Sequence, residues 1–301
     1  MLSLRYAYNT NGCAHHRLDD ALSLMADCGY DGVALTLDWH HFDPFAADWQ
    51  QRAEQLRRRL EALGLGCVIE TGARYLLNPR RKHDPILLSP EPESRARRVA
   101  FLCRALDIQV ALGAETMSCW AGVAAPELAR DAGMTLLQEG LKQVLDYAQE
   151  VGGEVSLEPE PGMFIETNAD YLVLRQQLGE RGQALRLALD LGHVWVTGEE
   201  QAHEGRRTAA FAALPAPAKA VHSLADRLGT VAIEGMDRGV HVHRPLDEGD
   251  MPIEPLLRAL RDVRFERLVT VELSRESHRA HLAIPQSINL LRRLERSSSP
   301  H

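Results

Sequence analysis

The chain has 301 residues, with 34 lysines and arginines against 42 aspartates and glutamates, and a net charge of −8 when histidine is counted neutral. Because 45% of the residues are hydrophobic and 25% are charged, the composition is that of a globular protein and excludes disorder, collagen and coiled coil. The acidic balance disfavours nucleic acid as a partner, since such affinity comes mostly from lysine and arginine.

The first residues and the cysteines bear on the compartment. The start, MLSLRYAYNTNG, has no basic stretch followed by a long apolar run, so neither a signal peptide nor a presequence is expected. No window approaches the roughly 18 consecutive apolar residues of a membrane helix. The five cysteines are scattered and form no CxxC pair, which favours reduced thiols. We therefore expect a cytoplasmic protein without membrane contact.

Short apolar runs recur along the chain and predict eight strands. They are LRYAYN (4–9), GVALTLD (32–38), GCVIE (66–70), ETMSCW (115–120), EVSLE (154–158), ALRLALD (184–190), GTVAIE (229–234) and RLVTVEL (267–273). Between them, apolar residues at spacings of three and four predict amphipathic helices. Four of these segments end at a glycine suited to a helix C-cap, namely Gly29, Gly64, Gly113 and Gly152.

Eight strands separated by helices predict the α/β class and a parallel sheet closed into one (β/α)₈ TIM barrel. The alternative is an open doubly wound sheet, but neither GxGxxG nor GxxxxGK[ST] follows an early strand. No linker rich in Pro, Gly or Ser interrupts the chain. We therefore expect a single domain over residues 1–295 and a polar tail over residues 296–301.

Carboxylates and imidazoles gather where the later strands end, on the side of a barrel that carries active sites. Several acidic and imidazole groups at one mouth would repel one another or stay unsatisfied, and a divalent metal between them is the simplest resolution. A mixture of carboxylate and imidazole ligands suits manganese, zinc, cobalt or magnesium. Each residue alone could instead cap a helix, form a salt bridge or be a hydrogen-bonded core histidine. The candidate metal ligands are Glu158, Asp190, His193, His241, His243 and Glu272.

Other residues near strand ends are candidates for substrate contact. The loop over residues 78–92 is long and basic, which predicts a lid or binding element, although a solvated loop or a subunit contact is the alternative. Arginine offers a rigid donor fork for phosphate or carboxylate, so the cationic side chains of this loop suit an anionic or polyhydroxylated substrate. Trp39, with Trp120, is expected to wall the pocket, and His40 and His41 lie beside it. The substrate-binding candidates are Asp38, Glu70, Arg74, Lys82, His83, Trp120 and Arg275.

The motifs resemble the xylose isomerase-like barrel superfamily. The resemblance rests on Glu158, on LDLGH with Asp190 and His193, on RGVHVHRPLDEGD, and on VTVELSR with Glu272, and it covers residues 4–295. That superfamily contains sugar isomerases and epimerases, dehydratases and apurinic endonucleases. The combination of motifs is specific for the superfamily and not for one activity.

The resemblance also implies roles for individual residues. The main metal would be held by Glu158, Asp190, Glu272 and a histidine from the seventh strand. In the epimerase members the two glutamates, here Glu158 and Glu272, flank the substrate carbon and exchange its proton. The resemblance also raises the expectation of a homo-oligomer.

The seventh strand departs from the family pattern. Relatives often have a histidine followed by an acidic pair, whereas VAIEGM offers Ala232, Glu234 and Gly235. The fourth metal ligand is therefore missing from its usual position, and His241 or His243 could replace it.

A second resemblance points to the endonuclease members. His193 with the HxH pair is similar to their extra metal position. The histidines that those enzymes use at the ends of the third and fourth strands are Glu70 and Trp120 here, so a complete three-metal site is not expected. Glu70 could still bind metal.

Three hypotheses follow. The preferred one is a metal-dependent isomerase or epimerase of a sugar, sugar phosphate or keto-polyol, which transfers a proton through an enediolate. A dehydratase could use the same site. The second hypothesis is a hydrolase of the phosphoesterase or endonuclease type, and the third is a degenerate barrel kept for binding. The expected partner is a small carbohydrate-like substrate and no nucleic acid.

Overall fold

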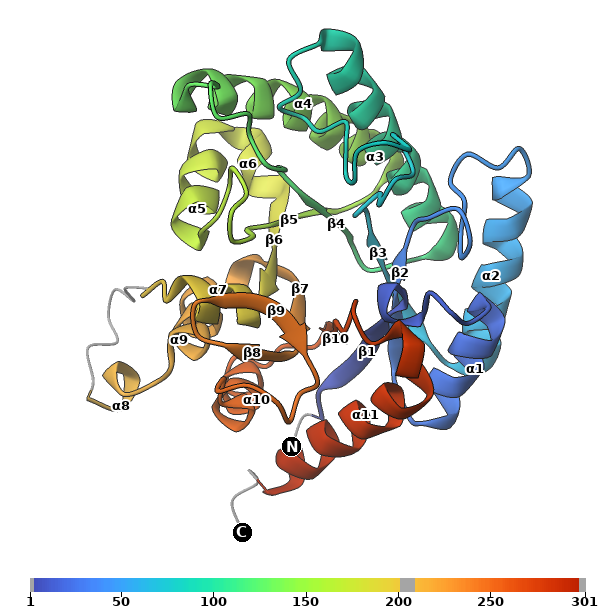
Figure 1. Ribbon diagram of the computed structural model, residues 1–301, viewed down its shortest axis with the longest axis vertical. Helices are drawn as coiled ribbons and strands as arrows, with labels where there is room; N and C mark the ends of the chain where they lie inside the picture. Colours follow the sequence, from blue (N-terminus) through green and yellow to red (C-terminus); the bar gives the residue numbers. More distant parts are fainter. Residues whose placement is uncertain (1–2, 201–208, 298–301) are drawn as a thin grey trace.

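Eight parallel strands form the centre of the molecule. The computed structural model describes residues 3–200 and 209–297. In it the strands close into a barrel in the order β1-β10-β7-β6-β5-β4-β3-β2, with helices around it, which confirms the predicted fold (Figure 1). The barrel strands are β1 (Arg5–Asn9), β2 (Gly32–Thr36), β3 (Gly66–Glu70), β4 (Met117–Trp120), β5 (Val155–Glu158), β6 (Leu185–Asp190), β7 (Leu228–Ile233) and β10 (Leu268–Val271).

The helices follow the amphipathic segments of the sequence. As predicted, α2, α3 and α4 end at glycines in the left-handed region, where a side chain would be strained. Helix α1 ends at Asp27 with Cys28 as its C-cap, and the left-handed Gly29 follows the cap. The α-helices are α1 (Leu18–Asp27), α2 (Trp49–Leu63), α3 (Pro92–Leu112), α4 (Arg130–Val151), α5 (Asn168–Gln177), α6 (Glu180–Ala184), α7 (Leu191–Thr197), α8 (Ala209–Ala212), α9 (Ala216–Leu224), α10 (Ile253–Asp262) and α11 (Ala280–Ser297).

Apolar side chains fill the barrel and the layer between strands and helices. A small cluster of Ala7, Ala34, Val68 and Leu268 is buried apart from one large core that spans the elements. Helix α11 runs to Ser297, two residues past the expected domain end, and residues 298–301 of the expected tail lie outside the described residues. None of the described helices combines the length and apolar character that crossing a membrane requires.

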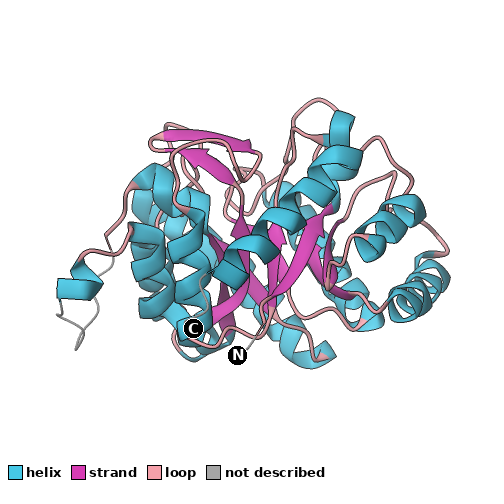
Figure 2. Ribbon diagram, turned by 90° about the horizontal axis from the view of Figure 1, so that it is seen from below, coloured by secondary structure: helices cyan, strands magenta, loops and turns pink. Residues whose placement is uncertain are grey.

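A two-stranded antiparallel hairpin interrupts the regular alternation after β7. Its strands are β8 (Gly235–Asp237) and β9 (Val240–Arg244), and it lies at the end of the barrel away from both chain termini (Figure 2). The Trp195 indole of α7 donates a 2.7 Å hydrogen bond to Asp250, just beyond the hairpin. The segment that carries His241 and His243 is therefore a paired and anchored element rather than an open loop.

Candidate active site

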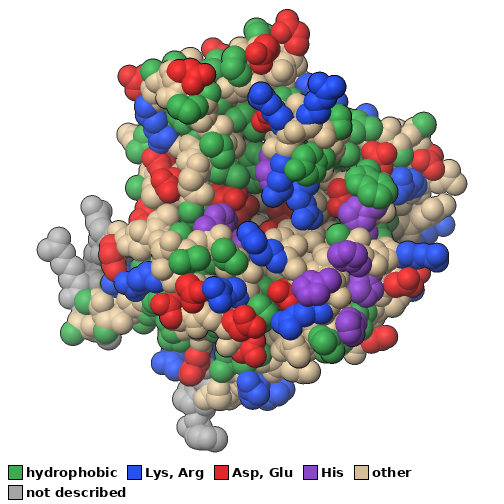
Figure 3. Space-filling view, in the orientation of Figure 1, with side chains coloured by type: hydrophobic (Ala, Val, Ile, Leu, Met, Phe, Trp, Pro, Cys, Tyr) green, Lys and Arg blue, Asp and Glu red, His purple; other side chains and the backbone are tan. Residues whose placement is uncertain are grey.

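A polar cavity of about 250 Å³ opens among the carboxyl ends of the strands. In the space-filling view the face is hollowed at its centre, with acidic side chains inside and basic and histidine side chains around the opening (Figure 3). Of the residues predicted for the site, eleven line this cavity: Glu70, Arg74, Lys82, His83, Trp120, Glu158, His193, His241, His243, Glu272 and Arg275.

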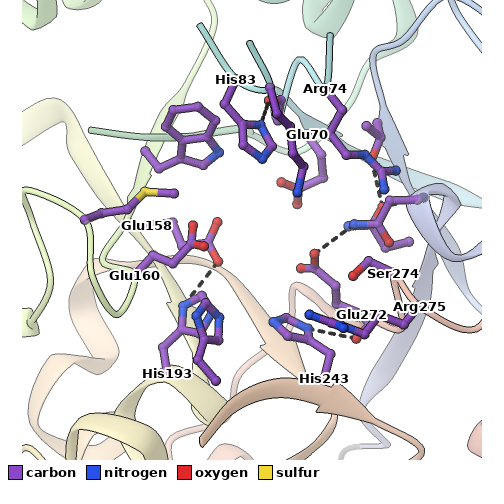
Figure 4. Close-up of a pocket in the computed structure, with 18 residues that line it drawn as sticks. Glu70, Arg74, His83, Glu158, Glu160, His193, His243, Glu272, Ser274 and Arg275 are labelled. Carbon is purple, nitrogen blue, oxygen red and sulfur yellow. Dashed lines mark hydrogen bonds and ion pairs between the residues drawn. The ribbon is translucent and has the colours of Figure 1, made fainter. Parts of the chain in front are cut away.

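The three predicted carboxylates come from the ends of three different strands. Glu158 is the last residue of β5, Asp190 is the last residue of β6, and Glu272 directly follows β10. Parallel strands in a barrel all end on the same side, so the strand ends bring these side chains together. Figure 4 shows Glu158 and Glu272 pointing into the cavity from opposite sides.

The candidate metal ligands form overlapping groups. Asp190 lies behind the cavity wall, and its carboxylate, the His243 ring and the Glu272 carboxylate offer ligand atoms within 4.8 Å of one another. Ligand atoms of Glu158, Asp190 and His193 also lie within 4.8 Å of one another, and so do those of His193, His241 and His243. All six residues predicted as metal ligands therefore belong to one continuous cluster.

Backbone carbonyls orient two of the histidines. The Nδ1 of His193 lies 3.0 Å from the Pro159 carbonyl, and the Nδ1 of His243 lies 3.1 Å from the Glu272 carbonyl. When Nδ1–H donates to a carbonyl, Nε2 keeps its lone pair. A ring held this way by its other nitrogen is the usual arrangement of a metal-ligating histidine. The Nε2 atoms of His193 and His241 lie 3.0 Å apart.

Burial and mutual repulsion disturb the acid groups of the cavity. Burial, and then the charge of Glu272, raise the pKa of Glu158 well above its usual value and the pKa of Glu70 to about 8. The same two causes raise the pKa of Glu160 to about 7. Burial lowers the pKa of His193 to about 4. A cation placed among these groups would favour both the carboxylates and the neutral imidazole.

Glu234 is a buried acid that the sequence marked only as a departure from the family pattern. It follows β7 and is fully buried, and neither of its carboxyl oxygens makes a hydrogen bond within the described residues. Burial, and then the neighbouring Asp190, raise its pKa well above the usual value. A Cβ at Gly192 would lie 1.8 Å from Glu234 Oε1, so the glycine of LDLGH leaves room for this carboxyl.

Other cavity residues were missed by sequence reasoning. Asn11, in the 3-10 turn η1 (Thr10–Cys13) after β1, donates a 2.8 Å hydrogen bond to Glu272 Oε1. Glu160 also lines the cavity and stands two residues after Glu158. The ExE spacing in SLEPEPG was a usable signal for Glu160, whereas a lone asparagine after the first strand carries none. Asn9, Thr36, Met163 and Ser274 complete the side chains that were missed.

Some predicted residues lie elsewhere. Asp38 does not line the cavity; its carboxylate accepts a hydrogen bond from the His41 backbone and lies beside the His40 ring. The chain turns at this point, with a bridge between Asp38 and Phe42, so the side chains after Thr36 leave the barrel mouth. Trp39 is 74% exposed and is not a wall of the pocket, unlike Trp120.

Comparison with known proteins gives the family. The sequence profile of the xylose isomerase-like TIM barrel family matches residues 22–294, and the chain belongs to this family. No curated protein matches the sequence significantly.

Solved structures with the same fold include several sugar epimerases at low identity. D-allulose 3-epimerase from Methylomonas sp., solved in complex with D-allulose, is 18% identical with a TM-score of 0.69, and the match covers 96% of each chain. The 3-keto-D-glucoside 4-epimerase of E. coli is 16% identical with a TM-score of 0.72, covering 97% of this chain and 100% of that one. The IOLI protein with a zinc atom is 13% identical with a TM-score of 0.73, covering 99% and 100%.

Proposed function

We propose that this protein is a metal-dependent isomerase or epimerase of a sugar, sugar phosphate or keto-polyol. The observation that carries the proposal is the placement of Glu158 and Glu272, which point into one cavity from opposite sides, with candidate metal ligands between them (Figure 4). Two carboxyl groups on opposite sides of a substrate carbon can remove a proton from one face and return it to the other.

The residues present suit a divalent ion. The ion would be held by Glu158, Asp190, Glu272 and His243. His243, from the hairpin, would replace the seventh-strand histidine ligand, a role that Ala232 cannot fill. Asp190 Oδ2 is buried and makes no hydrogen bond within the described residues, and its ion-pair contact is with His193 Nε2 at 3.5 Å, so this oxygen can accept a cation. When bound, the ion supplies Lewis-acid polarisation of adjacent carbonyl and hydroxyl oxygens, which acidifies the intervening C–H.

The chain's own groups would then move the proton. Glu158 acts as base toward the substrate carbon and Glu272 as the acid on the opposite face, or the reverse for the opposite epimer. The Asn11 amide holds one oxygen of Glu272 in place. Arg74, Lys82 and Arg275 line the cavity and form no ion pair within the described chain, so they are available to hydroxyl, carboxylate or phosphate oxygens of the substrate.

The epimerases with the same fold support a sugar as the substrate class. One of them was solved with D-allulose bound, and the polar lining of this cavity suits a polyol of that size.

A hydrolase of the phosphoesterase type is the second candidate. The observation that favours it is the group of His193, His241 and His243, which offers three imidazoles to an additional ion. Glu70 and Trp120 stand where the endonuclease members have histidines, which is why we rank this activity second.

The first experiment is elemental analysis of the purified protein with hydrogen exchange from candidate keto-sugars into D₂O. We expect about one equivalent of metal per chain, exchange at a single carbon, and loss of that exchange in Glu158→Gln and in Glu272→Gln. Glu93→Gln, at an exposed helix start, is the control and should exchange normally. A protein that takes up no metal after soaking in manganese would overturn the proposal, and two or three zinc ions with phosphodiester cleavage would favour the hydrolase.

A further inference from the structure

A second group of potential ligands lies outside the cavity, in the turn that follows β2. Asp38, His40 and His41 offer ligand atoms within 4.8 Å of one another. None of the three lines the cavity described above. Histidine side chains gather on this side of the face, near the ends of β1 and β2 (Figure 3).

His41 is held as a metal ligand would be. It is 3% exposed, and its Nε2 lies 3.0 Å from the His16 carbonyl, to which Nε2–H donates. The proton on Nε2 leaves a lone pair on Nδ1. Nδ1 is buried and has no partner in the described part of the chain. A buried ring nitrogen that has a lone pair and makes no hydrogen bond calls for an explanation, and a cation supplies one.

Asp38 and His40 complete the group. Asp38 is 4% exposed, and its Oδ1 lies 3.1 Å from His40 Nδ1. Neither ring nitrogen of His40 makes a hydrogen bond within the described residues. The backbone bond from His41 to Asp38 Oδ1 accounts for the turn, but it leaves the Nδ1 of His41 and the Nε2 of His40 without a hydrogen bond in the described residues.

We propose that Asp38, His40 and His41 bind a zinc ion separate from the ion of the proposed active site. Two imidazoles and a carboxylate match the ligands of zinc, and the partly exposed His40 leaves room for water as the fourth. The ion would join the turn after β2 to the segment after β1, because the His41 ring is tied to the His16 backbone. This proposal does not rest on the proposed function.

Zinc titration of the full chain tests the proposal. The protein is first treated with a chelator, and zinc is then added in competition with a chromophoric chelator. To separate the two sites, the titration is repeated in Asp190→Asn/His193→Gln, which takes at least one ligand from every candidate group at the cavity. We expect one tight zinc ion to remain in this variant, and at least tenfold weaker binding when His40→Gln and His41→Gln are added. Cobalt should give a visible d–d band that the added substitutions abolish.

Controls keep the outcome interpretable. His281→Gln changes an exposed histidine outside the group and should leave the zinc affinity unchanged. His40→Gln alone changes a partly exposed ring, so it should keep the fold, checked by circular dichroism, and still weaken zinc binding. Equal zinc affinity with and without the His40 and His41 substitutions would overturn the proposal. If zinc is lost only with the Asp190 and His193 substitutions, the proposed active site stands and this second site is rejected.

Discussion

Individual side chains set the chemistry of the cavity through a few contacts. Asn11 holds Glu272, a backbone carbonyl holds each of His193 and His243, and Glu234 fills the space beside Gly192. These contacts orient the ionisable side chains of the cavity and add no charge of their own. Substitutions that leave the charge of the cavity unchanged but remove one such contact are therefore the most informative.

Asn11→Ala should slow proton exchange by roughly 10- to 100-fold and change KM little, because it removes a charge-assisted hydrogen bond of about 1.5–3 kcal/mol that aligns Glu272. The measurement is the initial rate of deuterium incorporation over a range of substrate concentrations. Met163→Leu, at an apolar position of the same cavity, is the matched control and should stay close to the parent rate. Exchange by Asn11→Ala at the parent rate would show that Glu272 needs no such alignment.

Glu234→Gln should lower the free energy of unfolding at pH 7 by less than about 1 kcal/mol, and Glu234→Ala by roughly 2–4 kcal/mol. Burial holds the pKa of Glu234 well above its usual value, which favours the neutral carboxyl. The amide is a close replacement for that form, whereas alanine leaves a cavity. Urea unfolding in EDTA measures the free energy of unfolding of both variants. Equal losses in the two variants would contradict a neutral Glu234.

At the scale of elements, the hairpin β8–β9 delivers both His241 and His243 to the cluster. Its attachment includes the bond from Trp195 to Asp250 and the packing of Arg238 on the Trp195 ring, with 4.4 Å between the guanidinium carbon and the ring centroid. The position of two candidate ligands therefore depends on an indole that is not a ligand.

Trp195→Phe should weaken metal binding at the proposed active site by roughly tenfold, since it loosens the hairpin without touching a ligand. Competition with a fluorescent chelator gives the dissociation constant. Trp49→Phe is the matched control, because Trp49 packs on Arg104 away from the hairpin. If both variants bind metal as the parent does, the hairpin is held by contacts other than the indole.

The sequence predicted the barrel elements well and the hairpin not at all. Strand β3 was predicted at its observed bounds, Gly66–Glu70, because an apolar run there begins at a glycine and ends at a charge. The pairing of β8 with β9 is a contact between two short polar segments, which periodicity does not reveal. Asp38 was assigned to the pocket because the apolar pattern runs past Thr36, where pairing ends.

At the scale of the whole molecule, the metal-free barrel buries several carboxyl groups near its mouth. The folded chain keeps protons on Glu70 and Glu160, whose pKa values are raised to about 8 and about 7, while the unfolded chain gives them up near the usual pKa of 4.5. These two groups therefore lower the free energy of unfolding as the pH rises.

The metal-free protein should lose stability between pH 6.5 and pH 8. Burial lowers the pKa of both His193 and His83 to about 4. These two groups raise the free energy of unfolding as the pH rises, but only below their usual pKa of 6.5. Urea unfolding in EDTA at several pH values measures how steeply the free energy of unfolding falls with pH. Glu70→Gln should make this fall less steep, and bound metal should remove most of it. A stability that rises over this range would contradict the raised pKa values.

The hairpin has a consequence for the lifetime of the bound ion. Two of the candidate ligands sit on a hairpin whose strands pair with each other and not with the barrel strands, so the hairpin can open locally while the eight-stranded barrel stays closed. Release of the ion would then proceed through this local opening instead of global unfolding. The off-rate of the metal would report the opening equilibrium of the hairpin and would respond to changes in the hairpin that leave the melting temperature of the barrel unchanged.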